Sequence, residues 1–255
     1  MPEHKRRAWT RDELLKALSL YCQIPFGKMH SKNPAVIALA SAIGRTPAAV
    51  ALKLVNFASL DPELHGRGVR GMANASQADR SIWQEFFGKW DQLADHVICE
   101  EEASRAAPRR QPVDWSPPDG PTEMVRTARV RRGQSFFRAA VMAAYDNRCC
   151  ITGITSPELL RASHIVPWSG NPSLRLDPRN GLCLNALHDA AFDRGLIAFT
   201  DELELCISSR LKQEVPAAVY AEMFESRVGT QIRMPERFRP TTELLQLHRS
   251  ELFRG

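Results

Sequence analysis

Apolar side chains recur at helical spacing through the first part of the chain. The run Thr10-Arg11-Asp12-Glu13 has the pattern of a capping box and predicts a helix that ends before Pro25, with apolar positions at Leu14, Leu15, Leu18 and Tyr21. Two further helices are predicted over residues 34–43 and 46–57, the second with a proline at its favoured first position. A last helix follows Ser76 and carries an apolar stripe as far as Leu93. Residues 1–97 therefore predict an all-helical domain.

The second and third of these helices are separated by a short glycine-containing turn, which is the outline of a helix-turn-helix. In that interpretation the third helix is the recognition helix, and Arg45 and Lys53 lie near DNA. Small helical bundles show the same outline, so packing alone is the alternative. The basic loop at residues 66–71 either reaches phosphates or is simply solvated.

The composition changes between residues 98 and 125 to a glutamate run followed by proline-rich segments, which is typical of a linker. Residues 126–255 then predict a second domain of mixed strands and helices. It opens with RTARVRRGQSFFR (residues 126–138), a segment with five arginines and no acidic residue. Because the planar guanidinium bonds phosphate oxygens bidentately, Arg131, Arg132 and Arg138 are candidate contacts to a DNA backbone.

Short apolar runs alternate with turn residues between Leu159 and Gly195. The run up to Val166 predicts a strand, and residues 182–184 predict a second strand after an Asn-Gly turn signal. Good helix formers follow from Asn185, which is placed to cap the first turn. The predicted unit is strand, loop, strand and helix. Beyond it, residues 196–207 predict a hairpin, and residues 217–224 and 241–253 predict helices.

Three motifs within this unit are SHIVPW, RLDPRNGL and HDAAFDRG. They place His164, Asn180 and the pair His188-Asp189 in the order of the HNH nuclease motif. Residues 132–199 resemble the branch of that family found in bacterial restriction-type HNH endonucleases. The resemblance implies an α+β fold class, with a ββα-metal HNH nuclease domain and flanking helices following the all-helical, helix-turn-helix-like domain.

The activity that the resemblance implies is hydrolysis of phosphodiester bonds in double-stranded DNA. A phosphodiester resists attack because its negative charge repels nucleophiles, so the site needs a base to activate water and a cation to stabilise charge. His164 is the candidate base because the unperturbed pKa of imidazole lies near neutrality. By resemblance, Asn180 holds the loop between the strands and keeps His164 oriented through amide hydrogen bonds.

The cation is expected to be held by the helix. Residues four apart share a helix face, so Asp189 and Asp193 project together. Carboxylates suit a divalent metal ion such as Mg²⁺ or Mn²⁺, with Ni²⁺ and Zn²⁺ as further options. His188 either contacts the metal or has a packing or phosphate-contact role. For each aspartate, a structural hydrogen bond near the helix end is the alternative.

Two positions depart from what related nucleases show. Ser163 precedes the candidate base where many HNH nucleases have a metal-binding Asp or His, so more of the coordination must come from the helix, water or phosphate. Some HNH proteins also carry a structural zinc held by paired Cys-x-x-Cys motifs. Here Cys150 is followed three residues later by Gly153, and Asn185 and His188 stand where a second pair would be expected. We therefore expect no four-cysteine zinc site.

Composition and charge indicate the class of binding partner and the cellular compartment. The net charge of +5 over 255 residues fits an anionic partner. The six cysteines have no regular disulfide spacing, the N-terminal segment lacks an apolar signal core, and no apolar run approaches the length of a membrane span. These features predict a cytoplasmic protein with no membrane partner.

Together these inferences predict a metal-dependent DNA endonuclease of the restriction or defence type, in which residues 1–97 read the target. A single ββα-metal domain cuts one strand, so double-strand cleavage requires a homodimer or two successive nicks. Because Ser163 departs from the motif, a DNA-binding protein with a degenerate, inactive HNH site is the alternative. An RNA-directed or toxin nuclease is a further alternative.

Overall fold

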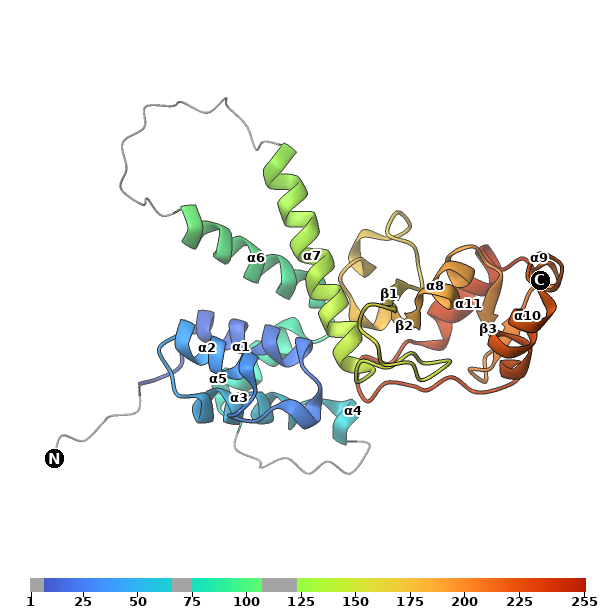
Figure 1. Ribbon diagram of the computed structural model, residues 1–255. Helices are drawn as coiled ribbons and strands as arrows, with labels where there is room; N and C mark the ends of the chain where they lie inside the picture. Colours follow the sequence, from blue (N-terminus) through green and yellow to red (C-terminus); the bar gives the residue numbers. More distant parts are fainter. Residues whose placement is uncertain (1–6, 66–74, 107–122) are drawn as a thin grey trace. The chain divides into compact units, whose positions relative to one another are not determined.

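The computed structural model describes residues 7–65, 75–106 and 123–255, and the chain divides into two compact units, residues 1–134 and 135–255 (Figure 1). The boundary between the units lies within helix α7 (Glu123–Ala144). Helices α6 (Trp90–Ala106) and α7 both extend into the segment expected to be a linker. These parts of the segment are helical, because glutamate, alanine and arginine are good helix formers, and the linker stays a prediction. The middle of the expected linker, residues 107–122, lies outside the described residues.

The first unit is helical, as the apolar pattern predicts. Its elements are α1 (Arg11–Gln23), the short 3₁₀ helix η1 (Phe26–Lys28), α2 (Pro34–Ala42), α3 (Pro47–Ala58), α4 (Pro62–His65), α5 (Gln77–Phe86) and α6. The predicted capping boxes at Thr10 and Ser76 are both confirmed. The single helix expected after Ser76 is wrong, since it breaks into α5 and α6 at Gly88. This residue has φ +76°, a backbone conformation that favours glycine.

Aromatic side chains form the centre of the first unit. The ring of Trp83 lies 5.7 Å from that of Tyr21 and 6.0 Å from that of Trp90, both in edge-on geometry. The Tyr21 hydroxyl donates a hydrogen bond of 2.6 Å to the buried carboxylate of Asp61, so the polar end of this core residue is satisfied. Helices α2 and α3 bend by 108° at the break between them.

Among the helices that the structure describes, none has by itself the length and apolar composition needed to cross a membrane, although α2 and α3 taken together meet both criteria.

The second unit is built on the hairpin of β1 (Leu160–His164) and β2 (Gly181–Asn185), which pair antiparallel with His164 opposite Gly181. Helix α8 (Ala186–Asp193) follows β2 directly and packs on both strands. The predicted order of strand, loop, strand and helix is confirmed, and so is Asn185 as the N-cap of α8. The loop between the strands contains the 3₁₀ helices η2 (Pro172–Leu174) and η3 (Pro178–Asn180).

The remaining elements follow α8 along the chain. The predicted hairpin is confirmed as β3 (Ile197–Phe199) and β4 (Leu205–Ile207), and it is followed by α9 (Ser209–Glu214), α10 (Ala217–Met223), η4 (Glu225–Arg227) and α11 (Thr242–Glu251). The chain after α11 packs closely on the turn that ends α8. A Cβ on Gly195 would lie 1.9 Å from the carbonyl oxygen of Leu252, and the Gly195 carbonyl accepts from the Arg254 amide at 2.9 Å.

Candidate active site

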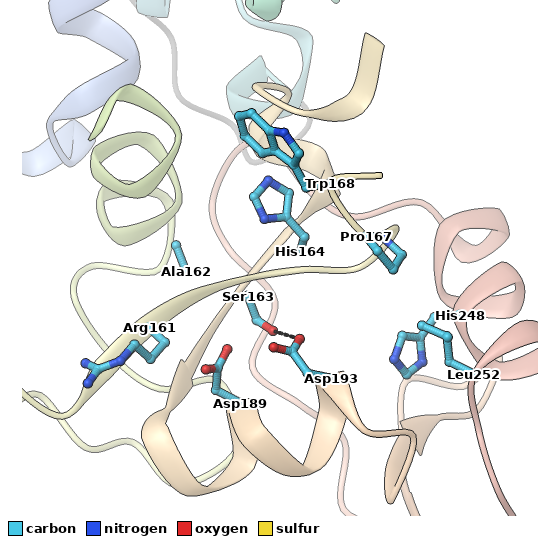
Figure 2. A pocket seen from close by; sticks show the side chains of 10 residues that line it. All are labelled: Arg161, Ala162, Ser163, His164, Pro167, Trp168, Asp189, Asp193, His248 and Leu252. Atoms are coloured by element: carbon cyan, nitrogen blue, oxygen red, sulfur yellow. Dashed lines mark hydrogen bonds between the residues drawn. The ribbon is translucent and has the colours of Figure 1, made fainter. Parts of the chain in front are cut away.

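A pocket of about 470 Å³ lies where the end of β1 faces α8 (Figure 2). Its lining comes from four segments of the second unit: β1, the loop after β1, α8, and the chain around α11. The lining residues are Arg161, Ala162, Ser163, His164, Pro167, Trp168, Asp189, Asp193, His248 and Leu252.

His164 is held on three sides at the end of β1. Its ring stacks on Phe137 of α7, with centroids 3.8 Å apart, and Trp168 meets it edge-on at 5.7 Å. Its Nε2 lies 2.9 Å from the carbonyl oxygen of Arg175. Because a carbonyl only accepts hydrogen bonds, Nε2 carries the proton and Nδ1 carries the lone pair. Burial lowers the pKa of His164, although the bond to the Arg175 carbonyl opposes this. The neutral ring therefore offers Nδ1 as a base.

Asn180 is fully buried and ties the loop between the strands together. Its Oδ1 accepts from the Val166 amide at 2.8 Å, and its Nδ2 donates to the carbonyls of Val166 and Leu174 at 3.0 and 3.1 Å. Arg175, whose carbonyl binds His164, directly follows Leu174. Its guanidinium also donates to the carbonyl of Trp168 at 2.8 Å. The side chain of Asn180 thus fixes the segment whose carbonyl binds the ring of His164.

Asp189 and Asp193 lie on one face of α8, and Figure 2 shows both side chains on the side of the helix that faces β1. Asp193 faces the pocket, yet the surrounding protein removes enough water from its carboxylate to raise the pKa, and the negative charge of Asp189 raises it further. The hydroxyl of Ser163 lies 3.5 Å from Oδ1 of Asp193 and opposes this shift. Two neighbouring carboxylates with this residual repulsion would be stabilised by a cation.

The donors in the pocket suit a hard divalent ion. Within the part of the chain that the structure describes, no group of three or more His, Cys, Asp or Glu side chains converges as a ligand set. The pocket offers two carboxylates, with the Ser163 hydroxyl beside one of them. Mg²⁺ is commonly bound through one or two carboxylates, with water and substrate phosphate completing its shell. The residues present therefore fit Mg²⁺ or Mn²⁺ better than an ion that needs a full cage of protein ligands.

His188 does not belong to this pocket. The residue is fully buried, with Nδ1 2.7 Å from the side-chain amide nitrogen of Asn185 and Nε2 2.9 Å from the carbonyl oxygen of Met223. Both ring nitrogens are therefore occupied by protein groups. Of the roles considered for His188, the structure gives it packing, because one position along a helix turns a side chain away from the face that holds Asp189.

The basic residues expected to contact DNA from the first unit are bonded inside it. Lys53 is 7% exposed, and its Nζ lies 2.7 Å from a carboxylate oxygen of Asp79. The guanidinium of Arg45 lies 2.7 Å from the carboxylate of Glu13. Both cations also lie over the ring of Trp9, at 4.4 Å for Arg45 and 5.0 Å for Lys53. The structure therefore places neither side chain where it reaches a phosphate, because each neutralises a buried acidic group.

Of the three arginines expected to contact DNA from α7, Arg138 is exposed and donates to the carbonyls of Leu160 and Pro157 at 3.1 and 3.3 Å. Arg132 is half-buried, and the side chain of Arg131 lies outside the described residues, as does the basic loop at residues 66–71.

The sequence alone assigns no role to three further residues of the pocket, although Trp168 belongs to the motif SHIVPW. Arg161 is exposed, and its guanidinium donates to the carbonyls of Glu158 and Leu160, both at 2.9 Å. Trp168 borders the pocket next to His164. His248 reaches the pocket from α11, a helix in which the sequence shows no chemistry, so only the folded chain brings it near α8.

Comparisons with known proteins give one family match. The family model described as HNH endonuclease matches residues 149–200, a segment that contains His164, Asn180, Asp189 and Asp193. A search of curated proteins finds no match. One similar solved structure is titled "Modification dependent TagI restriction endonuclease", with 22% sequence identity and a TM-score of 0.34. The match covers 46% of this chain and 37% of that chain, and at this TM-score it does not establish a shared fold.

Proposed function

We propose that this chain, whose residues 149–200 match the HNH endonuclease family model, hydrolyses phosphodiester bonds of double-stranded DNA with a divalent cation. The observation that carries the proposal is the shared pocket of His164, Asp189 and Asp193. In this proposal, β1, β2 and α8 are the ββα-metal finger. Because the motifs resemble the restriction-type branch of the family, we assign the protein to restriction or defence.

His164 acts as the general base in this mechanism. Its Nδ1 has no hydrogen-bond partner among the described residues, and it takes a proton from the water that attacks phosphorus. The Nε2 proton stays on the ring and donates to the carbonyl of Arg175, a bond that becomes stronger when the ring is positively charged. The same bond fixes the ring plane, so the lone pair of Nδ1 keeps its direction during the reaction.

Asp189 and Asp193 would hold the cation in the same pocket. When bound, a divalent ion stabilises the negative charge that develops on the phosphate and on the leaving oxygen. Ser163 holds Asp193 through its hydroxyl instead of supplying a carboxylate or imidazole of its own. Cleavage of the bond to the 3′-oxygen leaves a 5′-phosphate and a 3′-hydroxyl. Arg161 and Arg138, both exposed, are suited to contact the DNA backbone.

We assign target reading to the helical unit. The 108° bend between α2 and α3 is within the range of helix-turn-helix pairs. On α3 the side chains of Ala48 and Leu52 are exposed, whereas Lys53 is buried in an ion pair. An apolar recognition face suits contact with methyl groups in the major groove better than contact with phosphates.

The test is cleavage of supercoiled plasmid with Mg²⁺, Mn²⁺ or Ni²⁺. We expect His164→Ala to lower the nicking rate by about 10²-fold or more, because a positioned base contributes roughly that much. His30→Ala is the matched control, since His30 is exposed in the other unit. Asp189→Asn and Asp193→Asn should raise the Mg²⁺ concentration needed for half-maximal rate.

Each alternative has its own outcome in this experiment. Equal nicking by wild type and His164→Ala would overturn the proposed mechanism. Binding of DNA without cleavage under every metal would favour the degenerate-site alternative. Stronger competition by RNA than by DNA would favour an RNA-directed nuclease.

A further inference from the structure

Four polar side chains that do not line the pocket converge at the first turn of α8. They come from two short segments, each with a spacing of three positions: Cys149 and Thr152 before β1, and Asn185 and His188 at the end of β2 and the start of α8. The side-chain nitrogen Nδ2 of Asn185 lies 2.7 Å from His188 Nδ1, 3.2 Å from Thr152 Oγ1 and 3.8 Å from Cys149 Sγ. One atom of Asn185 is thus surrounded by the other three side chains.

The hydrogens in this cluster can be assigned. An amide nitrogen has two hydrogens, and the two shortest contacts are those to His188 and Thr152. His188 Nδ1 is then an acceptor, so Nε2 carries the proton and donates to the carbonyl of Met223 at 2.9 Å. The Asn185 oxygen accepts from the amides of Leu187 and His188, both at 3.0 Å. Every polar atom of both side chains is used.

The sulfur of Cys149 takes part as an acceptor. It is 3.3 Å from the backbone nitrogen of Asn185 and 3.5 Å from that of Thr152. Cys149 is 1% exposed, Asn185 4% and His188 0%, so water does not compete for these bonds. Backbone amides that point at a cysteine sulfur, and a histidine whose far nitrogen donates to a carbonyl, are also the outer-shell arrangement of metal-bound cysteine and histidine.

We propose that Cys149, Thr152, Asn185 and His188 form a metal-free structural cluster at positions arranged like those of a four-ligand zinc site, in which hydrogen bonds from the Asn185 amide hold the side chains together. Structural zinc sites draw pairs of ligands from two segments with such short spacings, and they bring four side chains to one point. Here thiol, hydroxyl, amide and imidazole replace thiolates, and hydrogen bonds replace coordination bonds. The cluster joins the segment before β1 to the start of α8 and, through Met223, to the end of α10.

The proposal predicts that two substitutions create a zinc site. In Thr152→Cys/Asn185→Cys, the cluster would present three thiolates and His188 Nδ1, with the Met223 carbonyl already placed to receive the Nε2 proton. We expect the reduced variant to bind one Zn²⁺ per chain, to show the absorption of tetrahedral thiolate-bound Co²⁺ when loaded with cobalt, and to unfold at a higher temperature with Zn²⁺ than after chelation. Thr155→Cys/Asn171→Cys, at two exposed positions, is the matched control and should show none of these effects.

The wild-type chain provides the second arm. Chelator treatment in Mg²⁺-free buffer should leave its far-UV circular dichroism unchanged. Metal analysis of the purified chain should find no bound zinc. One tightly held Zn²⁺ per wild-type chain would overturn the proposal, as would a folded double variant that binds no Zn²⁺. Should the double variant not fold, Asn185→Asp decides: it keeps the capping oxygen and loses both amide hydrogens. An unfolding temperature equal to that of wild type would overturn the proposal. None of these readouts depends on DNA cleavage.

Discussion

The loop between the strands is the part of the site where a single atom change has a calculable effect. In Asn180→Asp the side chain keeps its size and its acceptor for the Val166 amide, and it loses the two hydrogens that bind the carbonyls of Val166 and Leu174. Asn180 is 0% exposed, so water does not replace these bonds. The change therefore removes two donors and introduces a carboxyl group without creating a cavity.

The magnitude follows from the two carbonyls that lose their donor. A buried polar group left without its partner costs about 1 to 3 kcal/mol, so we expect the free energy of unfolding to fall by about 2 to 6 kcal/mol. A typical domain is stable by about 5 to 15 kcal/mol, so a loss in the lower part of this range leaves the variant folded in dilute buffer. Its cleavage rate should also fall, because the loosened loop carries the Arg175 carbonyl that orients His164.

Urea unfolding at neutral pH measures the loss, with Asn171→Asp as the matched control. Asn171 lies in the same loop, is exposed, and uses only its oxygen as an acceptor from Ser173, so aspartate should cost less than about 0.5 kcal/mol there. In the Asn180→Asp variant, burial should raise the pKa of the introduced carboxyl group in the folded state. The stability deficit should then shrink as the pH falls through that pKa, because the protonated acid can again donate one bond. Equal unfolding midpoints for the two variants would refute this account of the loop.

Three other predictions follow from groups whose environment only the fold defines. Because burial lowers the pKa of His164 below 6.5, kcat/KM for nicking should be flat above neutrality and fall only at a midpoint below pH 6.5; a midpoint above that value would contradict a buried neutral base. Burial lowers the pKa of His248 to about 4. The stability that the neutral ring contributes is therefore complete above pH 6.5 and is lost as the pH falls, by up to about 3 kcal/mol. The urea midpoints at pH 7.5 and pH 5 should then differ less in His248→Gln than in wild type. Lys53→Met leaves the buried Asp79 carboxylate without its cation and should cost about 3 to 5 kcal/mol in urea unfolding, whereas Lys16→Met removes a surface pair worth less than about 1 kcal/mol.

Features that depend on neighbours within a few residues could be predicted from the sequence. The capping residues Thr10, Ser76 and Asn185 are examples, because an N-cap side chain bonds a backbone amide two or three positions ahead. The order of β1, β2 and α8 follows in the same way from short apolar runs and turn residues. The common face of Asp189 and Asp193 follows from the helical period alone.

Features that depend on distant parts of the chain could not be predicted in this way. Lys53 and Arg45 look like surface cations in a helix-turn-helix, yet each is paired with a buried carboxylate from another helix. His188 belongs to the recognised motif, yet both of its ring nitrogens are bonded to protein groups, those of Asn185 and Met223. His248, from a segment with no apparent chemistry, lines the pocket instead.

The chain's sequence determined which chemical groups are available and which short elements carry them, because hydrogen bonds within a turn or a helix are fixed by residues close along the chain. The tertiary structure decided which nitrogen of His164 carries the lone pair, which carboxylates share a pocket with it, and which charges are neutralised internally. Those properties depend on burial and on partners that only the folded chain brings together, since a ring nitrogen becomes a base or a structural donor according to the group placed opposite it.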